Sequence, residues 1–114
     1  MMEAKNSIVY LFGFSSRIET KLRSLLQVIA EQIEEDIKIS IVLIHDGVIG
    51  SAKKEESPQV LIDLISLPVN VLAMIPDIKA RGMDSKNLLE RVKGISYDDL
   101  VDILVDSQKI VSWM

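Results

Sequence analysis

Three nearly continuous apolar runs, rich in isoleucine and valine, constrain the fold of this chain more than any other feature. They cover residues 7–14, 38–44 and 69–75. Short apolar runs without polar alternation are typical of strands that are covered on both faces, as in parallel sheets. Neighbouring parallel strands need a long crossover connection, which is usually a helix. We therefore expect βαβ units.

Amphipathic segments with helical spacing lie between these runs. Ser15 and Ser16 are expected to cap the first helix. Its predicted buried stripe consists of Ile18, Leu22, Leu25, Leu26, Ile29 and Ile33. After a loop at residues 50–56 that we expect to be exposed, Ser57-Pro58 is typical of a second helix start. The apolar face of that helix is Val60, Leu61, Leu64 and Ile65.

The C-terminal part of the sequence is less regular. A short helical turn over residues 78–81 is expected to end at Gly82 as a C-terminal cap. Residues 84–94 fit either a helix or a short edge strand through 92–95. Ser96 and Asp99 resemble a capping box before a further helix. Its predicted apolar face is Tyr97, Leu100, Val101, Leu104 and Val105, and a β-prone segment follows at 109–113.

Alternating strands and helices predict an α/β fold, a three-layer sandwich around a mainly parallel sheet of four or five strands. The 114 residues fit one domain over positions 1–114, without an internal repeat. No apolar run reaches the roughly 18 residues of a membrane span, and the first residues lack the features of a signal peptide. We therefore expect a cytoplasmic protein that does not contact a membrane.

The chain contains no cysteine, and this restricts its chemistry. Disulfides, thiolate nucleophiles, persulfide carriage, iron–sulfur ligation and cysteine-based zinc sites all need a thiol. A single histidine leaves little basis for a multi-histidine metal site. The net charge of −4 disfavours direct nucleic-acid binding, which needs a basic face. We accordingly assign no catalytic residue, metal ligand or cofactor.

Polar residues follow the predicted strands, and ligands of open parallel sheets collect outside the carboxyl ends of strands. His45 beside Asp46 could act as a general base, but a turn residue that bonds the backbone explains the same pattern, with Gly47 supplying a positive φ. The segment 13–16 could bind an anion, yet it lacks both glycine-rich phosphate motifs, and a tight turn with a cap suffices. Asp77, Lys79 and Arg81 form either a small polar site or a capped turn.

Trp113 is the only tryptophan and lies one residue from the end of the sequence. An apolar tail must dock on its own sheet or on another subunit, since chain ends fray unless they are held. Tryptophan is also a common anchor of subunit contacts.

The sequence resembles the DsrH/TusB family of the DsrE-like sulfur-relay fold. The resemblance rests on Leu43-Ile44-His45-Asp46-Gly47-Val48, on Asp77-Ile78-Lys79-Ala80-Arg81-Gly82, on Tyr97-Asp98-Asp99-Leu100-Val101 and on Ser112-Trp113. These segments occur in order over about residues 38–113. The D-x-x-A-R-G segment with the closing Ser-Trp is the most specific part.

The resemblance implies a subunit of a TusBCD- or DsrEFH-like complex, in which a DsrE-type partner carries persulfide sulfur. Such complexes serve 2-thiouridine formation on tRNA or sulfur oxidation. DsrH proteins of sulfur oxidisers can hold a cysteine, and this chain departs from them. Its expected partners are DsrE/TusD-like and DsrF/TusC-like subunits, or further copies of itself. The positions expected near subunit contacts or a ligand are His45, Asp46, Gly47, Asp77, Arg81, Gly82 and Trp113. For Trp113 the resemblance favours a contact with another subunit over docking on its own sheet.

Three hypotheses follow. The chain is an accessory subunit without a carrier cysteine, or a stand-alone homo-oligomeric α/β domain that regulates or binds a small ligand, or an enzyme that uses His45 and Asp46. The first ranks highest, because the partner brings the thiol. The third ranks last, because no catalytic constellation is recognisable.

Overall fold

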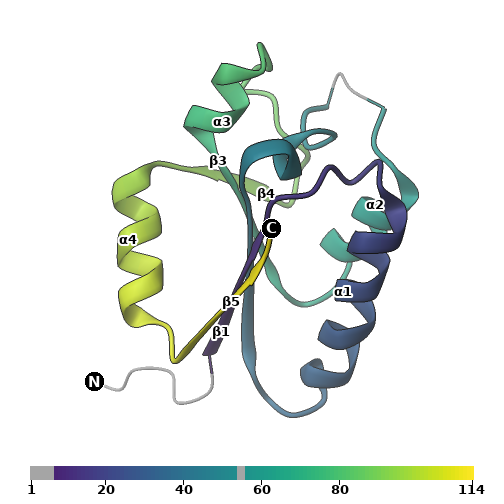
Figure 1. The fold of residues 1–114 in the computed structure, drawn as a ribbon, viewed down its shortest axis with the longest axis vertical. Helices are drawn as coiled ribbons and strands as arrows, with labels where there is room; N and C mark the ends of the chain where they lie inside the picture. The colour runs from purple at the N-terminus through teal and green to yellow at the C-terminus, as the bar shows by residue number, and fades with distance from the viewer. Residues whose placement is uncertain (1–6, 54–55) are drawn as a thin grey trace.

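The computed structural model describes residues 7–53 and 56–114, and within these ranges five strands form one all-parallel sheet of order β4-β3-β2-β1-β5 (Figure 1). The strands are β1 Ser7–Phe12, β2 Lys38–Leu43, β3 Asn70–Met74, β4 Val92–Ile95 and β5 Lys109–Trp113. Each of the three apolar runs contains one central strand. The predicted α/β fold is confirmed, and the five strands of the described ranges all pair in parallel.

Helices cover both faces of the sheet. Helices α1 (Glu19–Ile33) and α2 (Gln59–Ile65) pack on one face, and α4 (Tyr97–Asp106) lies on the opposite one (Figure 1). The chain moves in one direction from β1 to β4 and then returns across the sheet to β5. Because crossovers are right-handed, this reversal puts α4 on the opposite face. The short α3 (Ile75–Ala80) and the 3₁₀ turn η1 (His45–Val48) follow β3 and β2 at their carboxyl ends.

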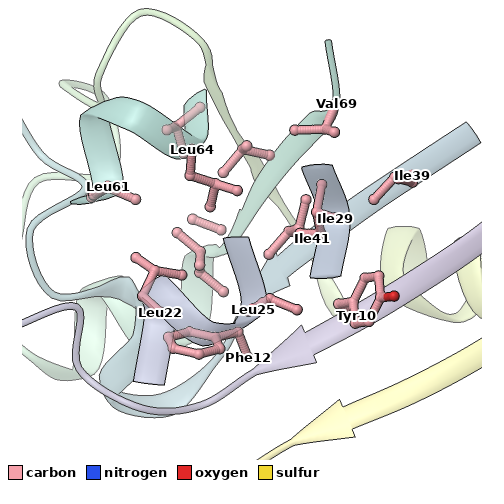
Figure 2. Close-up of a cluster of buried hydrophobic side chains, with 14 of the residues drawn as sticks. Tyr10, Phe12, Leu22, Leu25, Ile29, Ile39, Ile41, Leu61, Leu64 and Val69 are labelled. Atoms are coloured by element: carbon pink, nitrogen blue, oxygen red, sulfur yellow. The ribbon is translucent and has the colours of Figure 1, made fainter. Parts of the chain in front are cut away.

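Strand alternation divides the core into two clusters. Side chains such as Tyr10 and Phe12 contribute to the cluster beneath α1 and α2 (Figure 2). Their neighbour Val9 belongs to the cluster on the α4 side. The Tyr10 hydroxyl donates a 2.6 Å hydrogen bond to Gln32 of α1, and burial raises the pKa of Tyr10. The larger cluster therefore also contains a satisfied polar group.

Helix α1 begins later than the serine pair predicts. Its N-cap is Ile18, which has no side-chain oxygen and is 49% exposed, so Ile18 does not belong to the buried stripe. The Ser16 hydroxyl donates instead to the Ile49 carbonyl at 2.9 Å. Ser15 accepts a bond from the Arg17 amide at 3.2 Å. The two serines therefore hold the turn after β1 and do not cap the helix.

The loop at residues 50–56 is not wholly exposed, contrary to expectation. Ser51 and Ala52 are buried, because this segment pairs with residues 87–89. The Lys53 amide donates to the Asn87 carbonyl at 2.7 Å, and the Leu89 amide donates to the Ser51 carbonyl at 2.8 Å. Residues 54–55 lie outside the described ranges.

The ambiguity at residues 84–94 is resolved in favour of the edge strand. Residues 84–91 form turns, and β4 follows at Val92–Ile95. The capping box before α4 is confirmed, with Ser96 and Asp99 exchanging 3.1 Å bonds. The predicted apolar face of α4 is only partly right. Leu100, Ile103 and Leu104 pack on the sheet, whereas Tyr97, Val101 and Val105 are exposed.

The C-terminal tail docks on its own sheet. Strand β5 pairs in parallel with β1 over the register Ile8↔Lys109 to Phe12↔Trp113. The Trp113 side chain packs partly buried against the larger core cluster. None of the helices within residues 7–53 and 56–114 is long and apolar enough to cross a membrane.

Candidate functional site

The carboxyl ends of β2 and β3 place most of the predicted site residues side by side. These strands are neighbours, and η1 and α3 follow them directly. His45 and Asp46 belong to η1, while Asp77 and Arg81 come from α3 and its C-terminus. The predicted site residues therefore do lie together at the carboxyl ends of neighbouring parallel strands, where η1 contacts α3.

A hydrogen bond from its backbone amide fixes the position of His45. Its amide donates to the Asp77 carboxylate at 2.9 Å, and its φ of 49° lies in the left-handed region. That conformation is uncommon for residues other than glycine, and histidine tolerates it better than most. The imidazole itself is exposed and makes no hydrogen bond within the described part of the chain. The structure thus agrees with a turn residue and gives the ring no partner as a general base.

Gly47 was expected to supply a positive φ, and this expectation is wrong, since His45 supplies it. Gly47 is needed for space. A Cβ atom at this position would lie 2.2 Å from the Phe12 carbonyl oxygen of β1. The same carbonyl accepts the Ile44 amide at 3.0 Å, so the turn after β2 lies directly against the end of β1.

Arg81 joins η1 to α3 through its guanidinium. Its Nε and Nη2 atoms donate to one oxygen of Asp46 at 3.2 and 3.0 Å. Its Nη1 atom donates to the Asp77 carbonyl at 3.2 Å and lies 3.9 Å from the Asp77 carboxylate. Asp46 therefore pairs with arginine and not with the histidine ring. Lys79 takes no part in these ion pairs.

Gly82 ends α3 in the conformation that glycine favours. Its φ is 70°, its amide donates to the Lys79 carbonyl at 3.0 Å, and the Met83 amide donates to Ile78 at 3.1 Å. These two bonds make a Schellman motif, which confirms the predicted cap. Apart from Gly82 itself and its two chain neighbours, no atom of the described residues lies within 4 Å of a Cβ built on Gly82, so only its backbone conformation requires glycine.

Trp113 lies apart from this polar cluster, on the other side of β1. Its carbonyl accepts the Gly13 amide at 2.9 Å, and its ring packs towards the core. Met114 covers Gly13: a Cβ there would lie 3.1 Å from the Met114 Cγ atom and 3.7 Å from the His45 ring. Met114 and the His45 ring therefore both lie close to Gly13, at the end of β1.

The segment 13–16 shows a structural role rather than an anion site. The Ser16 hydroxyl is committed to Ile49, and α1 carries Glu19 in its first turn. A carboxylate at a helix N-terminus competes with any anionic ligand for the same favourable field. Within residues 7–53 and 56–114, no three histidine, aspartate or glutamate side chains are grouped in a way that could hold a metal ion.

Sequence reasoning missed the pairing of Asp46 with Arg81 and the contact of Gly47 with β1. Opposite charges at the ends of two predicted strands were the available signal for the pair. Using it requires the strand order, since only neighbouring strands bring their ends together. The closeness of Gly47 to Phe12 has no signal beyond the glycine itself.

Comparisons with known proteins agree with this architecture. The crystal structure of the ychN protein from E. coli has a TM-score of 0.74 and 17% identity, covering 95% of this chain and 99% of that one. A protein of unknown function from Methanobacterium thermoautotrophicum has a TM-score of 0.73 and 20% identity, covering 96% and 100%. At these identities the likeness supports the fold alone. Curated protein sequences gave no match.

The family comparison covers most of the chain. The model of the family described as DsrH like protein matches residues 15–110, which include η1, the Asp77–Gly82 segment, α4 and the start of β5. The residues that carried the sequence resemblance thus lie within the match, except for the closing Ser112-Trp113. The chain belongs to the DsrH-like protein family.

Proposed function

We propose that this chain is an accessory, cysteine-free subunit of a sulfur-relay complex, in which it packs against a cysteine-bearing DsrE-type partner. The observation that carries the proposal is a family match over residues 15–110 in a chain without any cysteine. A persulfide is a sulfur atom bonded to a cysteine sulfur, so this chain has no atom on which to carry one.

The geometry at the carboxyl edge supports a structural contribution. Arg81, Asp46 and Asp77 satisfy one another, and Gly47 and Gly82 serve the backbone. These motif positions shape the edge formed by η1 and α3 instead of providing a reactive group. Such an edge suits a subunit that supplies a surface while its partner supplies the thiol.

The family resemblance offers two destinations for the sulfur, 2-thiouridine formation on tRNA and sulfur oxidation. With a net charge of −4, this chain is not expected to bind tRNA itself. In the proposed cytoplasmic complex, a DsrE/TusD-like subunit holds the persulfide and a DsrF/TusC-like subunit completes the assembly.

Co-expression with the DsrE-type and DsrF-type subunits of the same genome tests the proposal. We expect the chain to co-purify with them, and persulfide transfer from a sulfur donor to need the whole assembly. Intact mass should show a reductant-sensitive gain of about 32 Da on the DsrE-type subunit and none on this chain. Such a gain on this chain, or a purified chain that forms only homo-oligomers beside these partners, would contradict the proposal.

The enzyme alternative is tested in the same assay by His45→Ala. Because the imidazole has no hydrogen-bond partner among residues 7–53 and 56–114, transfer should remain within a few-fold of wild type. A loss of about 100-fold, the scale of general acid–base catalysis, would show that His45 takes part in the chemistry.

A further inference from the structure

Helix α4 turns a row of apolar side chains outward. Tyr97, Val101 and Val105 follow one another at intervals of four along the helix and are 61%, 55% and 75% exposed. Residues at this spacing lie on one helix face. We call this row the α4 stripe. Single exposed apolar residues are normal on protein surfaces, whereas contiguous exposed apolar patches are a feature of interaction sites.

A row of carboxylates runs beside the α4 stripe. Asp98, Asp102 and Asp106 have the same spacing, are exposed, and form no ion pair within the described part of the chain. The last turn of α4 contains no basic residue, so Asp106 faces the negative end of the helix dipole. This arrangement is unfavourable in the isolated subunit, and cations from another molecule would relieve it.

Helix α4 also covers its face of the sheet less completely than α1 and α2 cover the other face. No residue of α4 is buried, whereas α1 and α2 each have three buried residues. Beneath α4, Leu11 and Leu72 remain only partly buried although they lie on inner strands of the sheet. Inner parallel strands are normally covered fully on both faces. The α4 side of the molecule therefore lacks part of the cover that the other side has.

We propose that the α4 stripe with its flanking aspartates is the surface on which the cysteine-bearing partner subunit docks. The charge defines that partner's surface as an apolar groove bordered by lysine or arginine. Like charges disfavour docking against the same face of a second copy, a nucleic-acid backbone or an anionic membrane. The inference rests on the proposed function, which supplies the partner's identity.

The test measures the affinity of the purified chain for the DsrE-type subunit, with a double variant, Val101→Glu with Val105→Glu. Both side chains are exposed, so circular dichroism of the free chain should change little, and its melting temperature should fall by no more than a few degrees through the charge added near the end of α4. The dissociation constant should rise by at least about 30-fold, the scale of losing the anchor of an interface. The matched control is Val28→Glu, at a valine of α1 that is 39% exposed, and it should leave the affinity unchanged.

A second variant tests the charges, with Asp98, Asp102 and Asp106 all changed to Asn. Its association rate should fall several-fold and lose most of its dependence on salt, because rim charges act mainly on encounter. The free variant should melt within a few degrees of wild type, since it removes a favourable charge in the first turn of α4 at Asp98 and an unfavourable one in the last turn at Asp106. An unchanged association rate would overturn the role of these aspartates in docking, whatever the melting temperature.

The outcomes separate this inference from the proposed function. If wild type binds the DsrE-type subunit and the double variant binds equally well, the inference is wrong and the proposed function stands. The same holds if the double variant loses only self-association or only binding to the DsrF-type subunit. If wild type does not bind the DsrE-type subunit at all, the proposed function fails and the inference falls with it.

Discussion

Gly47 and Gly82 belong to the same family resemblance but need the absence of a side chain for different physical reasons. At Gly47 the limit is space, because the backbone of β1 occupies the position where a Cβ would lie. At Gly82 the limit is conformation, with φ at 70° and open surroundings. A backbone carbonyl inside a sheet cannot move away as a flexible side chain can. The two glycines should therefore respond differently to the same substitution.

We expect Gly47→Ala to lower the free energy of unfolding by about 3 kcal/mol, since β1 or η1 must shift to admit the methyl group. Gly82→Ala should cost only about 1 kcal/mol, the penalty of a left-handed conformation at an exposed site. Urea unfolding of both variants measures the difference. Equal losses would show that η1 can move away from β1 without cost.

The sequence alone identified the residues at the carboxyl ends of the strands, but it did not identify the bonding partner of each. Asp77 and Arg81 were recognised as polar groups after a strand, and the structure shows that Asp77 holds the His45 amide and Arg81 holds Asp46. Those bonds join segments more than thirty residues apart. Side-chain type indicates what a group can bond to, while the choice of partner depends on which strands are neighbours.

At the scale of helices and strands, a sequence pattern predicted the structure where a single local interaction decides it. The capping box at Ser96 needs only two residues three positions apart, and it was predictable. The buried face of α4 was not, because six of its ten residues are apolar and their periodicity fits more than one face. Ile18 shows the same limit: its spacing suits the stripe of α1, but the chain enters the helix only after it.

The capping box at the start of α4 makes the stability of the protein depend on pH. Bonds from the Ser96 backbone and side chain lower the pKa of Asp99 below its usual range. A group with a lowered pKa in the folded state stabilises the fold above its unfolded pKa, and this contribution is lost as the pH falls towards the folded value. We therefore expect stability to decrease as the pH drops below about 4. In Asp99→Asn this part of the acid-induced loss should be absent.

Chemical denaturation between neutral pH and about pH 3 checks the prediction by comparing the slopes of the two proteins. Asp98→Asn is the matched control, because its exposed carboxylate makes no capping bond and should leave the slope near that of wild type. Equal slopes for Asp99→Asn and wild type would show that the capping bond is not formed in solution.

At the scale of the whole molecule, fold class followed from the sequence but strand order did not. Apolar runs separated by helices predict parallel strands whatever their arrangement. The return from β4 to β5 across the sheet puts the last strand beside β1, and no local pattern encodes that choice. For the tail, the residues left two arrangements open and the family resemblance favoured a subunit contact, whereas the structure has the tail paired with its own sheet.

Because the tail pairs with β1, we expect the last strand to contribute to the stability of the domain. Strand β5 is an edge strand, but β1 is central only because β5 covers it, from Ile8 to Phe12. Removal of residues 110–114 would expose the edge of β1, whose residues are almost all buried. It would also remove the Trp113 ring from the core cluster. Loss of a large aromatic side chain from a core costs roughly 3–5 kcal/mol, a large share of the stability of a small domain.

We therefore expect the chain without residues 110–114 to lose much of its helical circular-dichroism signal and its cooperative thermal transition. Removal of Met114 alone is the matched control, because this residue is exposed and belongs to no strand. That shorter variant should melt within a few degrees of wild type. Light scattering on both proteins distinguishes the other role of the tail. A five-residue truncation that stays folded but has a smaller oligomeric mass would place Trp113 at a subunit contact instead of in the core.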